Sequence, residues 1–158
     1  MTRKMRRFKQ QITDEEVRVI LREQWRGVLA LQGDDDYPYA LPINFYYDEE
    51  KGCIYFHGAK EGYKIDAIRR NPKACFCVLN DGTRDEGDWA LRISSVIVTG
   101  KMREVTDAEE HDSSILAFAE KYYPDEESAR AEVAKDGARA HMIALTIESM
   151  TGKKVHEK

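Results

Sequence analysis

The sequence predicts a mainly β domain: an antiparallel sheet of about six strands that closes into a small barrel, with helices at its flanks. Two observations support this fold class. Most apolar runs are short and bounded by turn residues, as strands are. Successive runs are joined by hairpin-length polar loops, and few are separated by a helix that could cross over between parallel strands. Six or so strands of this kind close readily as a barrel.

An amphipathic helix opens the domain. Thr13 and Glu16 have the spacing of a capping box, in which each side chain bonds the backbone N–H of the other residue. Apolar residues then recur at helical spacing and predict a helix over residues 14–24. Gly27 ends this helix, and the apolar run 28–31 predicts the first strand.

Two prolines mark the second strand. Residues 37–47 are rich in aromatic and aliphatic side chains and predict one strand. Proline cannot donate to a β-ladder, so Pro38 and Pro42 indicate a sheet edge, a bulge or a ligand. Backbone groups left unpaired around Pro42, Ile43 and Asn44 could bond the polar edge of a planar heterocycle, and a simple edge bulge explains the same pattern.

A turn of small residues joins the third strand to the second helix. Residues 53–57 predict the strand, and Gly58 and Ala59 let the backbone turn tightly and a ligand approach closely. A short helix is expected over residues 62–70, because Pro72 follows it.

Three polar side chains flank this turn. Lys60 and Lys64 lie at the start of the second helix, where free N–H groups and the positive end of the dipole favour an anion such as phosphate. An ordinary junction with solvated lysines is the alternative. His57 ends the strand and could act on a ligand near neutral pH, or could be a structural histidine.

The second half of the chain completes the sheet and adds two helices. The strand at 73–79 alternates so that Cys75 and Cys77 share a face. Their Cys-x-Cys spacing is not that of zinc or thiol-redox sites, and buried apolar cysteines are expected. The remaining elements are strands over residues 89–105 and 140–147, a helix from 106 that ends before Pro124, and a helix over 126–135.

Three residues of the predicted strand over residues 89–105 have two interpretations each, one functional and one structural. Ser94 and Ser95 interrupt an apolar run, and buried hydroxyls need partners, so they serve either a ligand or the neighbouring backbone. Trp89 could stack on a planar ring or belong to the core. The histidines lack metal-ligand spacing, and no hydrolase, P-loop or Rossmann motif is present, so no metal is expected.

Size and charge limit the function further. The 158 residues suit a single domain over residues 1–158, with residues 1–10 as a flexible basic tail. The net charge of −4 argues against general nucleic-acid binding. The sequence has neither an apolar run of membrane-helix length nor a secretory signal, so we expect a cytoplasmic protein without a membrane partner.

Taken in order, these segments resemble the pyridoxamine 5′-phosphate oxidase-like flavin-binding split barrels, and within them the 5-nitroimidazole resistance (Nim) type. The resemblance covers nearly the whole chain. The residues that carry it are 27–31, 37–39, 41–45, 54–64, 68–72, Trp89, 94–96, Gly100 and 150–153.

The resemblance implies a six-stranded split barrel that forms a homodimer, with FMN in two clefts between the subunits. Residues 42–44 would follow the isoalloxazine edge, residues 57–59 the ribityl chain, and the two lysines the phosphate. Trp89 and Lys153 would reach the cleft from the partner subunit. The implied cofactor-binding residues are Pro42, Ile43, Asn44, His57, Gly58, Ala59, Lys60, Lys64, Trp89, Ser94, Ser95 and Lys153.

The implied activity is transfer of two electrons from NAD(P)H through FMN to a small electrophile. In the Nim type the electrophile is a nitro group, and His57 would be the polar residue nearest to it. The arginine-rich strand and the C-terminal segment of true pyridoxamine-phosphate oxidases are absent, so synthesis of pyridoxal phosphate is not expected. The alternatives are a non-enzymatic module that binds flavin, haem or F420, and a cofactor-free barrel for protein interaction.

Overall fold

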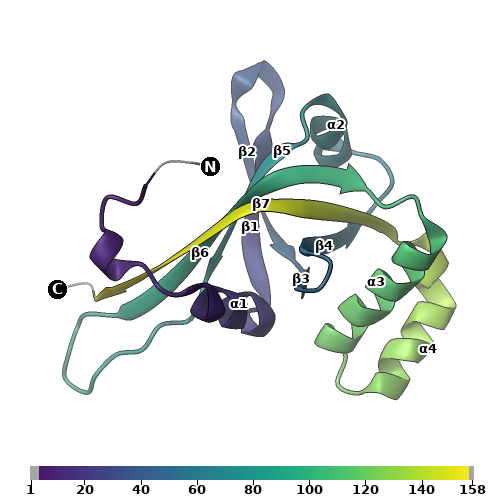
Figure 1. Ribbon diagram of the computed structural model, residues 1–158. Coiled ribbons are helices and arrows are strands. Elements are labelled where there is room, and N and C mark those ends of the chain that lie inside the picture. Colours follow the sequence, from purple (N-terminus) through teal and green to yellow (C-terminus); the bar gives the residue numbers. More distant parts are fainter. Residues whose placement is uncertain (1–3, 157–158) are drawn as a thin grey trace.

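One curled antiparallel sheet of seven strands forms the body of the molecule (Figure 1). The computed structural model describes residues 4–156, so the first residues of the basic segment, Arg3 included, lie outside the described part. The strands are β1 (Arg26–Gln32), β2 (Pro38–Asn44), β3 (Tyr46–Asp48), β4 (Cys53–Gly58), β5 (Lys73–Leu79), β6 (Arg92–Glu104) and β7 (His141–His156). They lie in the order β2-β1-β5-β6-β7-β4-β3. The mainly β class is therefore confirmed, with seven strands where six were predicted.

In the described part of the chain, four α-helices and three short 3₁₀-helices flank the sheet. The α-helices are α1 (Asp14–Glu23), α2 (Tyr63–Arg70), α3 (Ala108–Tyr122) and α4 (Glu126–Asp136). The 3₁₀-helices are η1 (Phe8–Gln10), η2 (Asp34–Asp36) and η3 (Gly137–Arg139). The α3 and α4 helices form an antiparallel pair beside one end of the sheet (Figure 1). None of the helices within residues 4–156 is long and apolar enough to cross a membrane.

The predicted single strand over residues 37–47 is wrong: it is two strands at opposite edges of the sheet. β2 pairs with β1 and β3 pairs with β4, yet only Phe45 separates them along the chain. The two edges must therefore meet at Phe45, and this meeting curls the sheet into a split barrel. Pro42 lies in the edge strand β2, as its missing N–H requires.

We call the place where the two sheet edges meet, at Phe45, the seam. The α3 helix supplies hydrogen-bond partners for its backbone groups. The Phe45 N–H donates to the Tyr122 hydroxyl at 2.8 Å, and the Phe45 carbonyl accepts from Lys121 Nζ at 3.0 Å. Lys121 also donates to the carbonyl of Gln24, at the end of α1, at 2.6 Å. Burial lowers the pKa of Lys121 to about 8. Buried backbone groups at a strand break need such partners, so α3 holds the seam closed.

The last strand is twice as long as predicted. β7 continues to His156 because its second half pairs with β6, from Ser149 opposite Thr99 to His156 opposite Arg92. A bulge between Thr99 and Gly100 lets the long ribbon bend. β6 itself begins at Arg92, later than the predicted residue 89.

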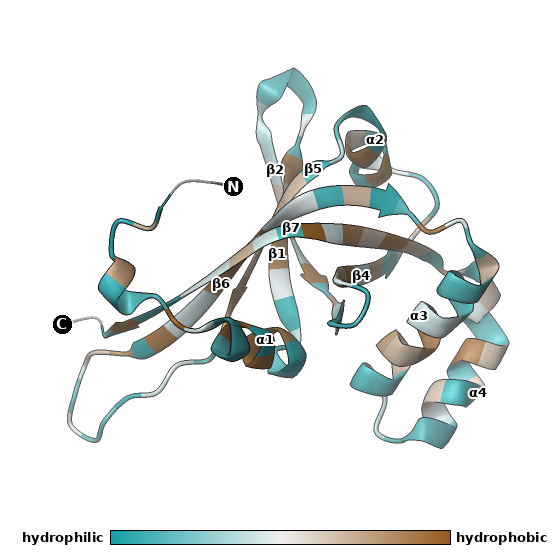
Figure 2. Ribbon diagram, in the orientation of Figure 1, coloured by the Kyte–Doolittle hydropathy of each residue, from teal (hydrophilic) through white to brown (hydrophobic). Residues whose placement is uncertain are grey.

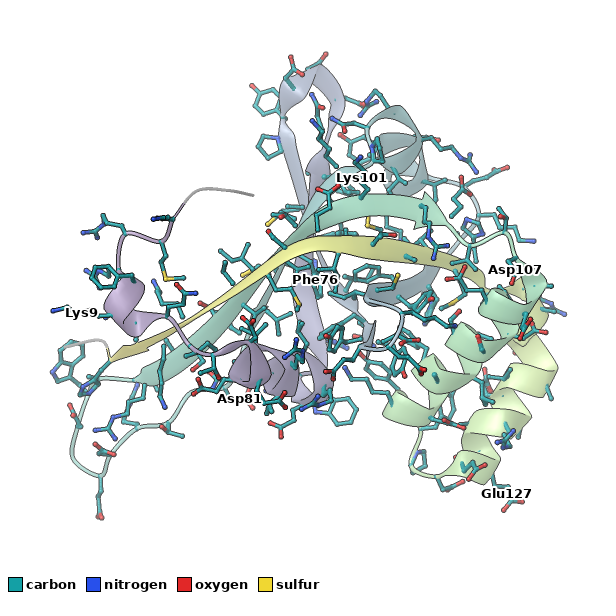
Figure 3. The ribbon with its side chains drawn as sticks, viewed as in Figure 1. Lys9, Phe76, Asp81, Lys101, Asp107 and Glu127 are labelled. Carbon is teal, nitrogen blue, oxygen red and sulfur yellow. The ribbon has the colours of Figure 1, made fainter. Side chains whose placement is uncertain are left out.

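The core fills the space inside the curled sheet. Phe76 lies in the middle of the sheet and makes edge-to-face contacts with Phe45 and Phe56, with ring centroids 4.9 and 5.2 Å apart (Figure 3). Apolar residues gather along the inner strands, whereas the outer faces of the helices are polar (Figure 2). The predicted capping box of Thr13 and Glu16 is confirmed at α1, which buries Leu21 against this core.

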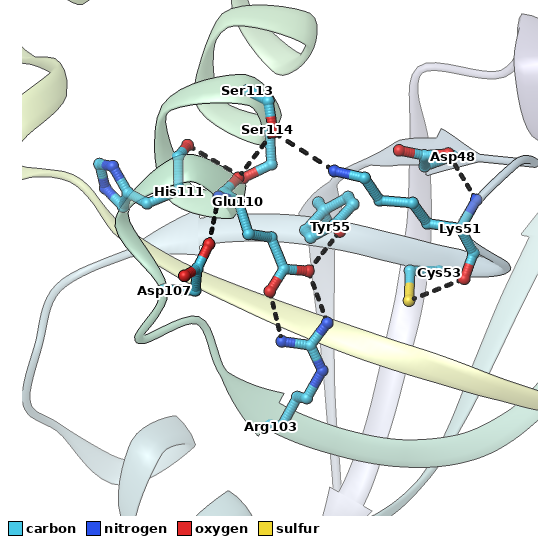
Figure 4. A network of polar contacts seen from close by, with 10 residues as sticks. All are labelled: Asp48, Lys51, Cys53, Tyr55, Arg103, Asp107, Glu110, His111, Ser113 and Ser114. Atoms are coloured by element: carbon cyan, nitrogen blue, oxygen red, sulfur yellow. Dashed lines mark hydrogen bonds and ion pairs between the residues drawn. The ribbon is translucent and has the colours of Figure 1, made fainter.

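A polar network fastens the start of α3 to the sheet (Figure 4). The Glu110 carboxylate accepts two hydrogen bonds from the Arg103 guanidinium, at 2.6 and 2.9 Å, and a third from the Tyr55 hydroxyl at 2.5 Å. The Arg103 hydrogen bonds are the main reason that the pKa of Glu110 falls to about 2. The Asp107 side chain caps α3 through the N–H of Glu110.

Candidate functional site

A cleft opens where the seam brings β2 beside the end of β4. It has a volume of about 290 Å³, near the lower limit for small-molecule sites. Its lining residues are Arg26, Pro42, Ile43, Asn44, His57 and Phe118. Four of these were singled out from the sequence, and the structure brings them together because the two sheet edges meet at Phe45.

Beyond the cleft, the turn after β4 leads to a lysine with no acceptor. Lys64 lies in the first turn of α2, after Gly62 at a φ of 120°. Its Nζ lies so close to Gly58 that a Cβ added there would be only 2.7 Å away. Burial lowers the pKa of Lys64, and no described residue gives its ammonium a hydrogen bond or an ion pair. A partly buried, unpaired ammonium at a helix N-terminus is suited to an anion.

His57 lines the cleft and lies near Lys64. Its ring packs edge-on against Phe118 at a centroid distance of 4.7 Å. Burial, and secondarily the nearby Lys64 charge, lowers the pKa of His57. The lowered pKa favours the neutral imidazole, which carries one donor and one acceptor nitrogen. Ala59 and Lys60, the next two turn residues, are exposed.

Four of the predicted residues lie at the other end of the sheet. Ser94 and Ser95 are near the start of β6, and Ser95 is paired in register with Lys153 of β7. His57 pairs with Met142, which lies eleven residues before Lys153 on β7, roughly 36 Å along the strand. Trp89 lies in the loop before β6 and is 68% exposed. Within one chain these residues do not meet the cleft.

The two serines also point to opposite faces. Ser94 is 8% exposed and faces the core, with its N–H donating to the Asn80 side chain at 2.8 Å. Ser95 lies on the outer face, which it shares with Ile97. Of the pair, only Ser95 is placed to meet a molecule outside the sheet.

That outer face is apolar. Val28, Cys77 and Ile97 are adjacent in register across β1, β5 and β6. Val28, Leu79 and Ile97 are 38%, 49% and 44% exposed. The prediction of buried cysteines is wrong for Cys75 and Cys77, which lie half-buried on this face. Side chains alternate along β5, so Phe76 points into the core and the two cysteines point outward.

Two lining residues of the cleft were missed in the sequence. Arg26 Nε donates to Asn44 Oδ1 at 2.8 Å, across the β1–β2 pair. Phe118 lies on α3, which the sequence predicted only as a helix. Neither has a local signal, because strand register and helix docking place them. Within residues 4–156, no group of three or more His, Cys, Asp or Glu side chains is arranged to hold a metal ion.

Comparison with known proteins agrees with this architecture. The sequence pattern of the family described as "Pyridoxamine 5′-phosphate oxidase" matches residues 13–154. The chain belongs to this family. The match includes both the cleft and the distant Ser95–Lys153 pair. No curated protein sequence matches the chain.

Solved structures share the fold at low sequence identity. A candidate 5-nitroimidazole antibiotic resistance protein from Bacteroides thetaiotaomicron is 20% identical, with a TM-score of 0.75 over 92% of this chain and 87% of its own. The flavocytochrome Anf3 from Azotobacter vinelandii is 21% identical, with a TM-score of 0.76 over 96% and 72%. An FAD-binding protein from Mesorhizobium loti is 21% identical, with a TM-score of 0.66 over 92% and 96%. The family's fold therefore extends over nearly the whole chain.

Proposed function

We propose that this protein is a cytoplasmic, single-domain flavoprotein that binds FMN and passes two electrons from NAD(P)H to a small electrophile of the nitro-compound type. The observation that carries the proposal is the unpaired Lys64 ammonium, packed against Gly58 beside the cleft. Structural neighbours described as FAD-binding proteins and as a flavocytochrome add support for a flavin. A single terminal phosphate matches one partly buried ammonium, which favours FMN.

The residues of the cleft fit this cofactor. Lys64 and the N-terminus of α2 would hold the phosphate, with the exposed Lys60 nearby. Gly58 leaves room for the Lys64 side chain, which a larger residue would displace. The unpaired edge of β2 at residues 42–44 offers backbone groups to the polar edge of the flavin ring.

Flavin, when bound, supplies the two-electron chemistry, and the protein supplies binding and orientation. The lowered pKa of His57 favours its neutral form, which can donate a hydrogen bond from one ring nitrogen to a polar group of the substrate. The Phe118 ring packs edge-on against the imidazole, which stays exposed to solvent at the end of β4. Arg26 holds Asn44 in place through its hydrogen bond to the amide oxygen.

A second copy of the chain would complete the site. The apolar outer face around Val28, Leu79 and Ile97 suits a homodimer, since such a patch is costly in water. Ser95 lies on this face and Trp89 and Lys153 lie at the same end of the sheet, so docking could carry them to the partner's cleft.

The test compares two ligands that differ by one phosphate. In Lys64→Met, we expect FMN affinity to fall about tenfold to a hundredfold, because a charge-assisted contact contributes about 1.5–3 kcal/mol. Riboflavin, which lacks the phosphate, should lose less than threefold. Flavin fluorescence quenching measures both. Lys73→Met, an exposed lysine on β5, is the matched control. Unchanged FMN affinity in Lys64→Met contradicts the assignment.

A second variant tests the electron transfer. His57→Ala should lower turnover with nitroaromatic acceptors more than it weakens FMN binding. Equal losses of binding and turnover would identify His57 as a structural residue only. NAD(P)H-driven reduction of the flavin with no turnover of any acceptor would contradict the enzymatic part of the proposal and leave flavin binding in place.

A further inference from the structure

A second pocket, open to solvent on one side, lies behind His57, between the α3–α4 pair and the barrel. It has a volume of about 260 Å³, larger than the roughly 150 Å³ that accommodates a benzene molecule. His57 and Phe118 line both this cavity and the cleft, so the two spaces adjoin. We call this second space the helix-pair chamber.

The walls of the chamber are mainly apolar. Ile115, Phe118 and Ala119 contribute from α3, and Val133 contributes from α4. Phe118 presents an aromatic ring that is packed in place by stacking on Tyr122 at a centroid distance of 4.9 Å. Such walls, with one fixed ring, suit a flat apolar molecule of one or two rings.

Besides His57 and Tyr123, the polar side chains that line the chamber are acidic. Glu132 and Asp136 lie one turn apart on α4 and both line it. The Asp136 carboxylate forms ion pairs with two exposed cations, Lys135 at 3.5 Å and Arg139 at 3.6 Å. Glu132 has no ion pair or hydrogen bond with any residue of the described chain. The chamber therefore carries uncompensated negative charge beside an apolar wall, which attracts a cation and repels an anion.

We infer that the helix-pair chamber binds small arylalkylamines, with the ring against Phe118 and the ammonium group toward Glu132. A molecule seated there touches His57 and so lies next to the cleft. The binding itself requires no flavin and does not rest on the proposed function.

Two probes with the same ring test the chamber. 1-Naphthylmethylamine is a cation at pH 7, and 1-naphthoate is an anion. Calorimetric titration of the flavin-free protein should show at least tenfold tighter binding of the amine. In Glu132→Gln this preference should shrink about fivefold, the effect of losing one half-buried charge. Equal binding of both probes, or an unchanged preference in Glu132→Gln, would overturn the inference.

A second pair of variants tests the location. Val133→Phe fills the chamber and should abolish amine binding. Ala134→Phe makes the same kind of change at the next residue, which lines a neighbouring groove and not the chamber, and should keep the affinity within twofold. Equal affinity in the two variants would place the amine elsewhere. FMN affinity, measured on the same samples, reports the proposed function separately, because neither residue lines the cleft.

Discussion

Replacing Glu110 by glutamine should destabilise the protein at neutral pH and have little effect near pH 2. The glutamine amide would keep an acceptor for Tyr55 but lose the charge that pairs with Arg103. The native carboxylate has a pKa of about 2 against its ordinary value of 4.5, which corresponds to about 3 kcal/mol at about 1.4 kcal/mol per tenfold. Arg103 is 41% exposed, so solvent screening reduces the expected loss to about 2 kcal/mol.

The pH dependence follows from the direction of the pKa change. The folded state holds the Glu110 carboxylate ionised to lower pH than the unfolded state does. The stabilisation of the folded state by the ionised carboxylate is therefore fully present above pH 4.5, the pKa in the unfolded chain. It is lost as the pH falls toward 2, the pKa in the folded state. The difference in unfolding free energy between the native protein and Glu110→Gln should shrink over that window.

Urea unfolding at pH 7, 5 and 3.5 measures this difference. At pH 7 the midpoint should fall by about 1 M, taking about 2 kcal/mol per molar for a domain of this size. Glu109→Gln removes the same charge from the neighbouring exposed residue and should change stability by less than about 0.5 kcal/mol. A loss below about 0.5 kcal/mol in Glu110→Gln, or one that is constant with pH, would refute the reasoning.

Two further predictions concern the closure and the bend of the barrel. Tyr122→Phe removes the hydroxyl that accepts from the Phe45 N–H and lies 2.9 Å from the Phe45 carbonyl. The free energy of unfolding, measured in urea, should fall by about 1–3 kcal/mol. A neutral effect would mean that water replaces the hydroxyl. Gly100→Ala places a methyl group against the backbone carbonyl of Thr146, which cannot move aside. Thermal unfolding should therefore show that the protein loses about 3 kcal/mol of stability. An unchanged melting temperature would contradict this packing.

Patterns set by neighbours along the chain could be read from the sequence. The capping box at Thr13, the strand over residues 73–79 and the helix after Gly62 all depend on residues a few positions apart. The glycine-containing turn with Lys64 behind it was recognised for the same reason. The family resemblance rested on these local segments in their order.

Features that depend on residues far apart in the sequence required the tertiary structure. Phe45 separates two strands only because their partners, β1 and β4, lie far apart in the sheet, each next to an opposite edge. The second half of β7 is a strand because β6 pairs with it, although its own sequence is polar. Phe118 enters the cleft through the docking of α3. Local periodicity fixes what an element is, whereas pairing and docking fix where it lies, and the cleft is built from where the elements lie.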